Sequence, residues 1–100
     1  MRRILILGGT GDAAALATEL ARWPDVEVIS SLAGRTQTPA IPDGTTRIGG
    51  FGGLAGLTAY LRQQQISHLI DATHPFAAQI SWTAAEAAQA VGVALSLIHI

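Results

Sequence analysis

The chain has 100 residues, 49% of them hydrophobic, which suits one folded domain with a packed core and argues against disorder. With a formal net charge of −1 and no lysine, it lacks the basic surface that neutralises a nucleic-acid backbone, so nucleic acid is excluded as a partner. The absence of cysteine excludes disulfides, thiolate metal sites and a catalytic thiol.

The first third of the chain predicts two strands joined by a helix. Residues 4–7 are continuously apolar, as in a parallel strand that helices cover on both faces. Glycines follow, and then Leu16, Leu20 and Trp23 recur at helical spacing. The β-branched run at residues 26–31 predicts the second strand.

The middle of the chain repeats this alternation. Residues 32–46 contain a Gly-Arg-Thr step and a Pro/Asp/Gly cluster, so we expect an irregular segment there, and then a short strand at residues 47–48. A helix follows, with its apolar stripe at Leu54, Leu57 and Leu61. Residues 66–71 predict the next strand.

A third helix is expected to begin at Pro75 and to end at a C-terminal cap formed by Gly92, with a last strand from residue 93. Trp82 lies off the apolar face of this helix, so we expect an exposed ring that marks a contact surface. The apolar face consists of Phe76, Ile80, Ala84, Ala87 and Val91.

Alternating strands and helices predict an α/β fold, a Rossmann-like and mostly parallel sheet with helices on both faces. Ligands of such sheets bind beyond the carboxyl ends of the strands. No run of the chain is long enough for a membrane span or a signal-peptide core, so we expect a cytoplasmic protein without a membrane partner.

Residues 8–14 (GGTGDAA) contain the pattern G-x-G-x-x-A between a predicted strand and a predicted helix. Gly9 would form the tight turn, Gly11 would let a pyrophosphate approach the backbone, and Ala14 would let helix and strand pack closely. The alternative is a strand-to-helix turn without a ligand.

The end of the second strand favours NADP over NAD. NAD-binding proteins usually carry an acidic residue there for the ribose hydroxyls, whereas this chain has Ser30 and Ser31, with Arg35 close behind. Hydroxyl and guanidinium groups suit a 2′-phosphate. The alternative is that these residues belong to a solvated surface loop.

Two further segments lie on the expected ligand side. Residues 49–53 (GGFGG) suggest a loop that a ligand approaches closely, with Phe51 either stacking on the ligand or buried in the core. Asp71 and Thr73 end a strand, and His74 precedes a proline at a helix start. His74 either contacts cofactor or donates a proton, or it caps the helix, and Asp71 is open in the same way between ligand and turn.

Four segments together resemble the precorrin-6A reductase family of cobalamin biosynthesis. They are residues 4–11 (ILILGGTG), 31–36 (SLAGRT), 47–53 (RIGGFGG) and 71–77 (DATHPFA). The first is common among dinucleotide-binding proteins, whereas the glycine-flanked Phe51 and the block from Asp71, in this order, are specific. The resemblance extends over residues 3 to 94.

The resemblance implies an NADPH-dependent oxidoreductase of porphyrin and cobalamin biosynthesis that reduces one double bond of a tetrapyrrole, precorrin-6A or cobalt-precorrin-6A. The nicotinamide would supply the hydride, and the protein would hold it against the macrocycle. His74 is then the candidate catalytic residue. The three histidines lack the clustered spacing of a metal site, so no metal is expected. The cofactor-binding residues it implies are Gly9, Thr10, Gly11, Asp12, Ser31, Arg35, Thr36, Gly50, Phe51, Gly52, Asp71 and Thr73.

The family pattern continues into a second α/β domain, so we expect residues 1–100 to be a truncated, NADP-binding Rossmann-like domain without that second domain and with doubtful activity. Residues 96–100 depart from the family pattern. The alternatives are another small NADP-dependent reductase and a non-catalytic NADP-sensing module. Because the chain lacks lysine and has a single tyrosine, Tyr60, a Tyr/Lys proton-donor pair is not supported.

Overall fold

The computed structural model describes residues 2–8, 11–32, 45–73 and 78–97. Strands and helices alternate along the chain, except that β2 and β3 follow each other without a described helix between them. The elements are β1 (Arg2–Leu7), α1 (Gly11–Ala21), β2 (Val26–Leu32), β3 (Thr45–Ile48), α2 (Gly53–Gln63), β4 (His68–Asp71), α3 (Ala78–Val91) and β5 (Ala94–Leu97).

The five strands form one sheet in the order β3-β2-β1-β4-β5, and every neighbouring pair is parallel. This confirms the predicted α/β class and its parallel sheet. The chain builds the sheet outward from β1 in one direction and then returns to add β4 on the other side. The order therefore reverses between β1 and β4, where Leu7 pairs with Ser31 on one side and with Asp71 on the other.

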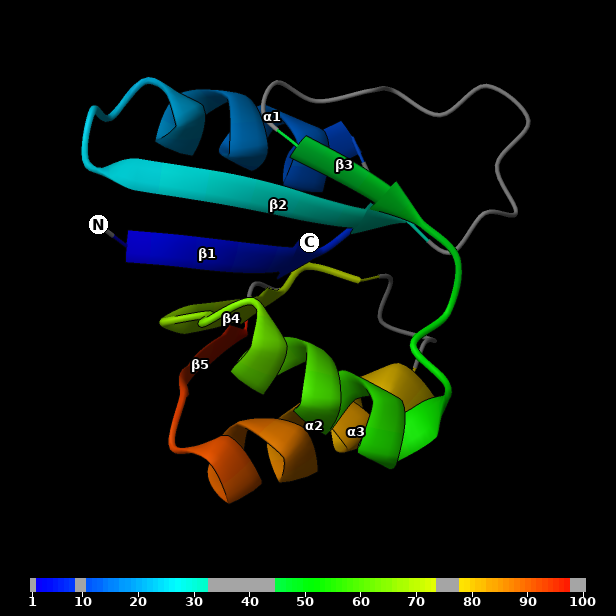
Figure 1. Cartoon of the computed structure of the whole chain (residues 1–100). Helices are drawn as coiled ribbons and strands as arrows, with labels where there is room; N and C mark the ends of the chain where they lie inside the picture. The colour runs from blue at the N-terminus through cyan, green and yellow to red at the C-terminus, as the bar shows by residue number, and fades with distance from the viewer. Residues whose placement is uncertain (1, 9–10, 33–44, 74–77, 98–100) are drawn as a thin grey trace.

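Helices cover both faces of the sheet, with α1 on one face and α2 and α3 packed together on the other (Figure 1). Because successive strand residues point to opposite faces, β1 divides its side chains between two cores. Leu5 and Leu7 pack with α2 and α3, whereas Ile4 and Ile6 pack with α1. This two-sided burial is the reason that residues 4–7 are continuously apolar.

Most element boundaries agree with the sequence, and the differences come from strand pairing. β2 is longer than predicted because Leu32 pairs with Ile48, and β3 is longer because Thr45 and Thr46 pair with Ile29 and Ser30. β4 begins at His68 instead of residue 66, since the Ile66 amide still donates to the Leu61 carbonyl of the preceding helix.

Two side chains lie elsewhere than the helical spacing predicted. Trp23 does not belong to the helical stripe: α1 ends at Ala21, the Trp23 amide closes a turn on the Leu20 carbonyl, and the ring is 64% exposed. Leu54 is also 42% exposed although it shares the stripe of Leu57, so the buried part of α2 starts one turn later than predicted.

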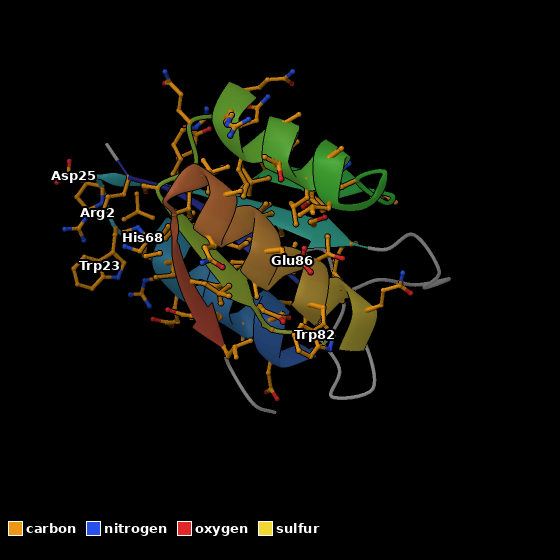
Figure 2. The ribbon with its side chains drawn as sticks, turned by 90° about the horizontal axis from the view of Figure 1, so that it is seen from below. Arg2, Trp23, Asp25, His68, Trp82 and Glu86 are labelled. Carbon is orange, nitrogen blue, oxygen red and sulfur yellow. The ribbon has the colours of Figure 1, made fainter. Side chains whose placement is uncertain are left out.

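The Gly92 cap and the exposed Trp82 predicted for the third helix are confirmed, whereas the contact surface that Trp82 would mark stays a prediction. Gly92 has a φ of 79°, and its amide and that of Val93 both donate to the Ala88 carbonyl, which caps α3. Trp82 is 72% exposed and lies with Glu86 on the outward side of α3, at the end of the molecule opposite Trp23 (Figure 2). Pro75 and Phe76 lie outside the described residues.

Candidate functional site

The turn after β1 brings the strand end and α1 into close contact. The Gly8 amide donates to the Ser31 carbonyl at 2.9 Å, and a Cβ added to Gly8 would lie 3.2 Å from the Cβ of Ala13. Gly11 begins α1 and is exposed, and a Cβ added there would meet nothing within 4 Å. Within the described residues, the space beside Gly11 is thus unfilled, as the glycine pattern requires, and a pyrophosphate contact there stays a prediction.

Of the residues predicted to contact the phosphates, the structure describes Asp12 but not Gly9 and Thr10. Asp12 is exposed in the first turn of α1. Gly9 and Thr10 lie outside the described residues, as do Arg35 and Thr36 of the segment after β2. Their contacts with a pyrophosphate and a 2′-phosphate stay predictions.

The two serines at the end of β2 lie on opposite faces of the sheet, so they cannot act as a pair on one ligand group. The Ser31 hydroxyl accepts a hydrogen bond from Nη1 of Arg47 at 3.0 Å. The Ser30 hydroxyl is buried and has no hydrogen-bond partner in the part of the chain that the structure describes. Its register neighbour on β3, Thr46, has an unpartnered buried hydroxyl as well, within the same described residues.

Arg47 is a site residue that the sequence analysis did not identify. It lies on β3 opposite Ser31, where its guanidinium donates to the carbonyl oxygens of Gly49 at 3.0 Å and Gly50 at 3.1 Å. The one signal in the sequence is an arginine two residues before the glycine cluster. Its partner Ser31 is 16 residues away, and only the pairing of β2 with β3 brings the two together.

Residues 49–53 connect β3 to α2 and run along the carboxyl side of the sheet (Figure 1). Three glycines of this loop have left-handed backbone conformations, with φ values of 111° at Gly49, 85° at Gly52 and 76° at Gly53. Such values are costly for any residue with a side chain, which explains the glycine cluster.

Phe51 is half-buried, packs against the core under α2 and α3, and meets Tyr60 edge-on with ring centroids 5.2 Å apart. The ring thus packs partly into the core, and its stacking on a ligand stays a prediction. The other ligand contacts expected from Gly50, Phe51 and Gly52 fall on the backbone, and they stay predictions.

The carboxylate of Asp71 joins the end of β4 to α3. Its Oδ1 accepts hydrogen bonds from the Thr73 amide at 3.1 Å and the Thr73 hydroxyl at 2.6 Å, and its Oδ2 accepts one from the Ser81 hydroxyl. Asp71 is only 3% exposed, and these bonds give it a turn-forming role, while a ligand contact from Asp71 or Thr73 stays a prediction. His74 lies outside the described residues, so its role stays a prediction.

The sheet gathers the described candidates along one edge. Four of them lie at the carboxyl ends of strands: Gly8, Ser31, Gly49 and Asp71. Backbone hydrogen bonds join the ends of neighbouring strands, because the Gly49 amide donates to the Leu32 carbonyl at 2.8 Å and the Ala72 amide donates to the Leu7 carbonyl at 2.9 Å. Among the described residues, no group of three histidines, cysteines or acids could hold a metal ion. No helix in these residues is long and apolar enough to cross a membrane.

A five-stranded parallel sheet in this order, with a glycine turn and polar groups at its carboxyl edge, defines a doubly wound α/β domain of the Rossmann type. The particular family follows from comparison with known proteins: the chain belongs to the precorrin-6x reductase CbiJ/CobK family, whose model matches residues 3–99.

Known relatives agree with this assignment. The chain is 55% identical over 99 residues to a precorrin-6A reductase from Rhodococcus erythropolis and 54% identical over 95 residues to one from Rhodobacter capsulatus. A solved structure named CobK precorrin-6A reductase superposes with a TM-score of 0.91 at 52% identity over 98% of the chain. The chain spans 40% and 38% of the two relatives' lengths and 39% of that solved chain.

Proposed function

We propose that this chain is the NADPH-binding part of a precorrin-6A reductase, which reduces one double bond of precorrin-6A or cobalt-precorrin-6A in cobalamin biosynthesis. The observation that carries the proposal is the family match over residues 3–99. The family is named for a reductase, and a reductase needs a bound source of electrons. The carboxyl edge of the sheet is where a dinucleotide would supply it.

The residues at this edge fit a dinucleotide. The start of α1 at Gly11 suits a pyrophosphate, because the amides and the positive dipole end of a helix N-terminus attract anions. No carboxylate stands at the end of β2, where NAD-specific domains use one for the ribose hydroxyls. Arg35 and Thr36 would then contact the 2′-phosphate.

When bound, NADPH would supply the hydride, so the chain's own residues have the tasks of holding and orienting it. The bonds of Asp71 to Thr73 and Ser81 fix the chain as it leaves β4. We propose His74 as the proton donor. In a polypeptide extended to the relatives' length, a His74→Asn change should lower kcat by about 10²-fold or more, and unchanged turnover would remove it from this role.

The test is a titration of the chain with NADPH and NADH by calorimetry, with Arg35→Ala and Arg22→Ala variants alongside. NADPH should bind more tightly than NADH, and Arg35→Ala should abolish the preference. Arg22 is the matched control because it is exposed and pairs only with Glu19 among the described residues. A folded chain that binds neither nucleotide would refute the cofactor assignment.

The extended polypeptide separates the reductase from a sensing module. NADPH binding together with oxidation of NADPH by precorrin-6A is the expected result. Binding without any turnover of the tetrapyrrole would instead favour a non-catalytic module, and the precorrin substrate would have to be withdrawn.

A further inference from the structure

The guanidinium of Arg47 joins three parts of the molecule. It donates to the Ser31 hydroxyl on β2 and to the carbonyl oxygens of Gly49 and Gly50 in the loop that follows β3. It also lies over the Phe51 ring, 3.8 Å from the centroid, and 5.1 Å from the centroid of Tyr60 on α2. One side chain thus contacts β2, the 49–53 loop and α2.

Arg47 has neutral partners in all of its described contacts. None of the ion pairs found among the described residues involves it, although its charge lies at the edge where ligands of this fold bind. Its planar group presents several N–H donors in a fixed geometry, which suits the simultaneous contact with two carbonyls and a hydroxyl.

The 49–53 loop needs hydrogen bonds such as those from Arg47 to hold one conformation. Glycine loses more backbone conformational entropy on ordering than any other residue. Because glycine has no side chain, side-chain packing does not offset that loss. Four of the five residues at 49–53 are glycine. The described contacts that fix the first half of the loop are the Gly49 amide on the Leu32 carbonyl and the bonds from Arg47.

The bonds from Arg47 also decide which way the peptide groups face. A trans peptide is planar, with its carbonyl and its N–H pointing in opposite directions, and the described residues contain no cis peptide. Since the carbonyls of Gly49 and Gly50 point to Arg47, the N–H groups of Gly50 and Phe51 point away from it. Gly50 is exposed, and a Cβ added there would meet nothing within 4 Å.

We infer that Arg47 is a positioning residue that turns the Gly50 and Phe51 amides outward as hydrogen-bond donors for an acceptor oxygen of the bound dinucleotide. This inference rests on the proposed function for its ligand. Arg47 acts through the loop and does not itself contact the nucleotide, so its role is geometric and not one of charge.

The experiment uses the ¹⁵N-labelled chain and its Arg47→Met and Arg47→Lys variants, with Arg22→Met as the matched control. In the free chain, exchange of the Gly49 amide, which donates to the Leu32 carbonyl, reports on the order of the loop. Titration with NADPH and NADH reports on binding. Circular dichroism verifies the fold. If Arg47→Met does not fold, a Ser31→Ala variant removes one of the hydrogen bonds that position the Arg47 guanidinium and is a milder test.

In the parent chain, NADPH should shift the amide resonances of Gly50 and Phe51. Arg47→Met should speed exchange of the Gly49 amide at least tenfold without affecting Leu5 in β1, and should raise the Kd values of NADPH and NADH by the same factor, about tenfold. Arg47→Lys should resemble Arg47→Met, because lysine keeps the charge but cannot reproduce the planar set of N–H donors of the guanidinium. Arg22→Met should change none of these.

Three results would overturn the inference. One is unchanged exchange in Arg47→Met, and another is full rescue by Arg47→Lys, which would assign the effect to charge. The third is loss of the NADPH preference in Arg47→Met, which would make Arg47 a direct phosphate ligand. If the folded parent chain binds neither nucleotide, the proposed function fails and the donor role with it, while the exchange rates still decide whether Arg47 orders the loop.

Discussion

Gly56 in α2 lies directly against the main-chain carbonyl of Phe51. A Cβ at position 56 would overlap both the oxygen and the carbon of that carbonyl, and these are backbone atoms that cannot rotate away. The absence of a side chain at Gly56 therefore lets the 49–53 loop pack onto the helix that follows it. The sequence analysis did not identify Gly56, because a lone glycine inside a predicted helix gives no sign of what approaches it.

A Gly56→Ala variant should lower stability and displace the loop. Helix propensity alone would favour alanine by up to about 1 kcal/mol, whereas overpacking against backbone costs about 1–3 kcal/mol, so we expect a net loss. Urea denaturation measures this loss. Gly50→Ala is the control, because a Cβ there meets nothing within 4 Å and its φ is ordinary. Equal or higher stability of Gly56→Ala would show that Phe51 can shift without cost.

Leu57 and Leu54 lie one turn apart in α2 but differ in burial. Leu57 is fully buried, and Leu54 is 42% exposed. We expect Leu57→Ala to lower the free energy of unfolding by about 2–5 kcal/mol, the usual cost of a cavity, and Leu54→Ala by less than about 1 kcal/mol. Thermal and urea unfolding of the two variants provide the comparison. Similar losses would mean that Leu54 is covered in solution, as its place in the helical stripe had predicted.

The sequence predicted the parts of the fold that depend on local pattern. Residues 4–7 are apolar because both faces of β1 are covered, and Gly92 follows α3 because its cap needs a positive φ. Trp23 was assigned to a helix because its spacing fits one. The spacing alone does not reveal that the chain turns after Ala21.

The contacts that shape the site depend on strand order, which one sequence does not contain. Nothing near Arg47 in the chain indicates that Ser31 will lie beside it, since that follows from the pairing of β2 with β3. The bond from Ser81 to Asp71 likewise depends on where α3 crosses β4. The sequence thus predicts which residues lie at the strand ends, but it does not predict which residues contact them.

Asp71 and Ser81 should be energetically coupled, because a buried carboxylate depends on its hydrogen bonds. Asp71→Ala should cost about 2–3 kcal/mol, and Ser81→Ala should cost about 1 kcal/mol or more. The double variant should be more stable than the sum of these losses predicts, by about 1 kcal/mol. A cycle of four urea denaturation curves measures the coupling, and additive losses would mean that this bond is not formed in solution.

The neighbouring serines of β2 provide the last prediction, because they differ in their partners although they adjoin in the chain. Ser31→Ala removes an acceptor from the cationic Arg47 and should cost about 1–2 kcal/mol. Ser30→Ala removes a buried hydroxyl without a described partner, so stability should stay the same or rise, since an unsatisfied polar group is costly to bury. Both are measured by urea denaturation without nucleotide. A large loss from Ser30→Ala would reveal a partner for that hydroxyl in solution, such as a bound water molecule shared with Thr46.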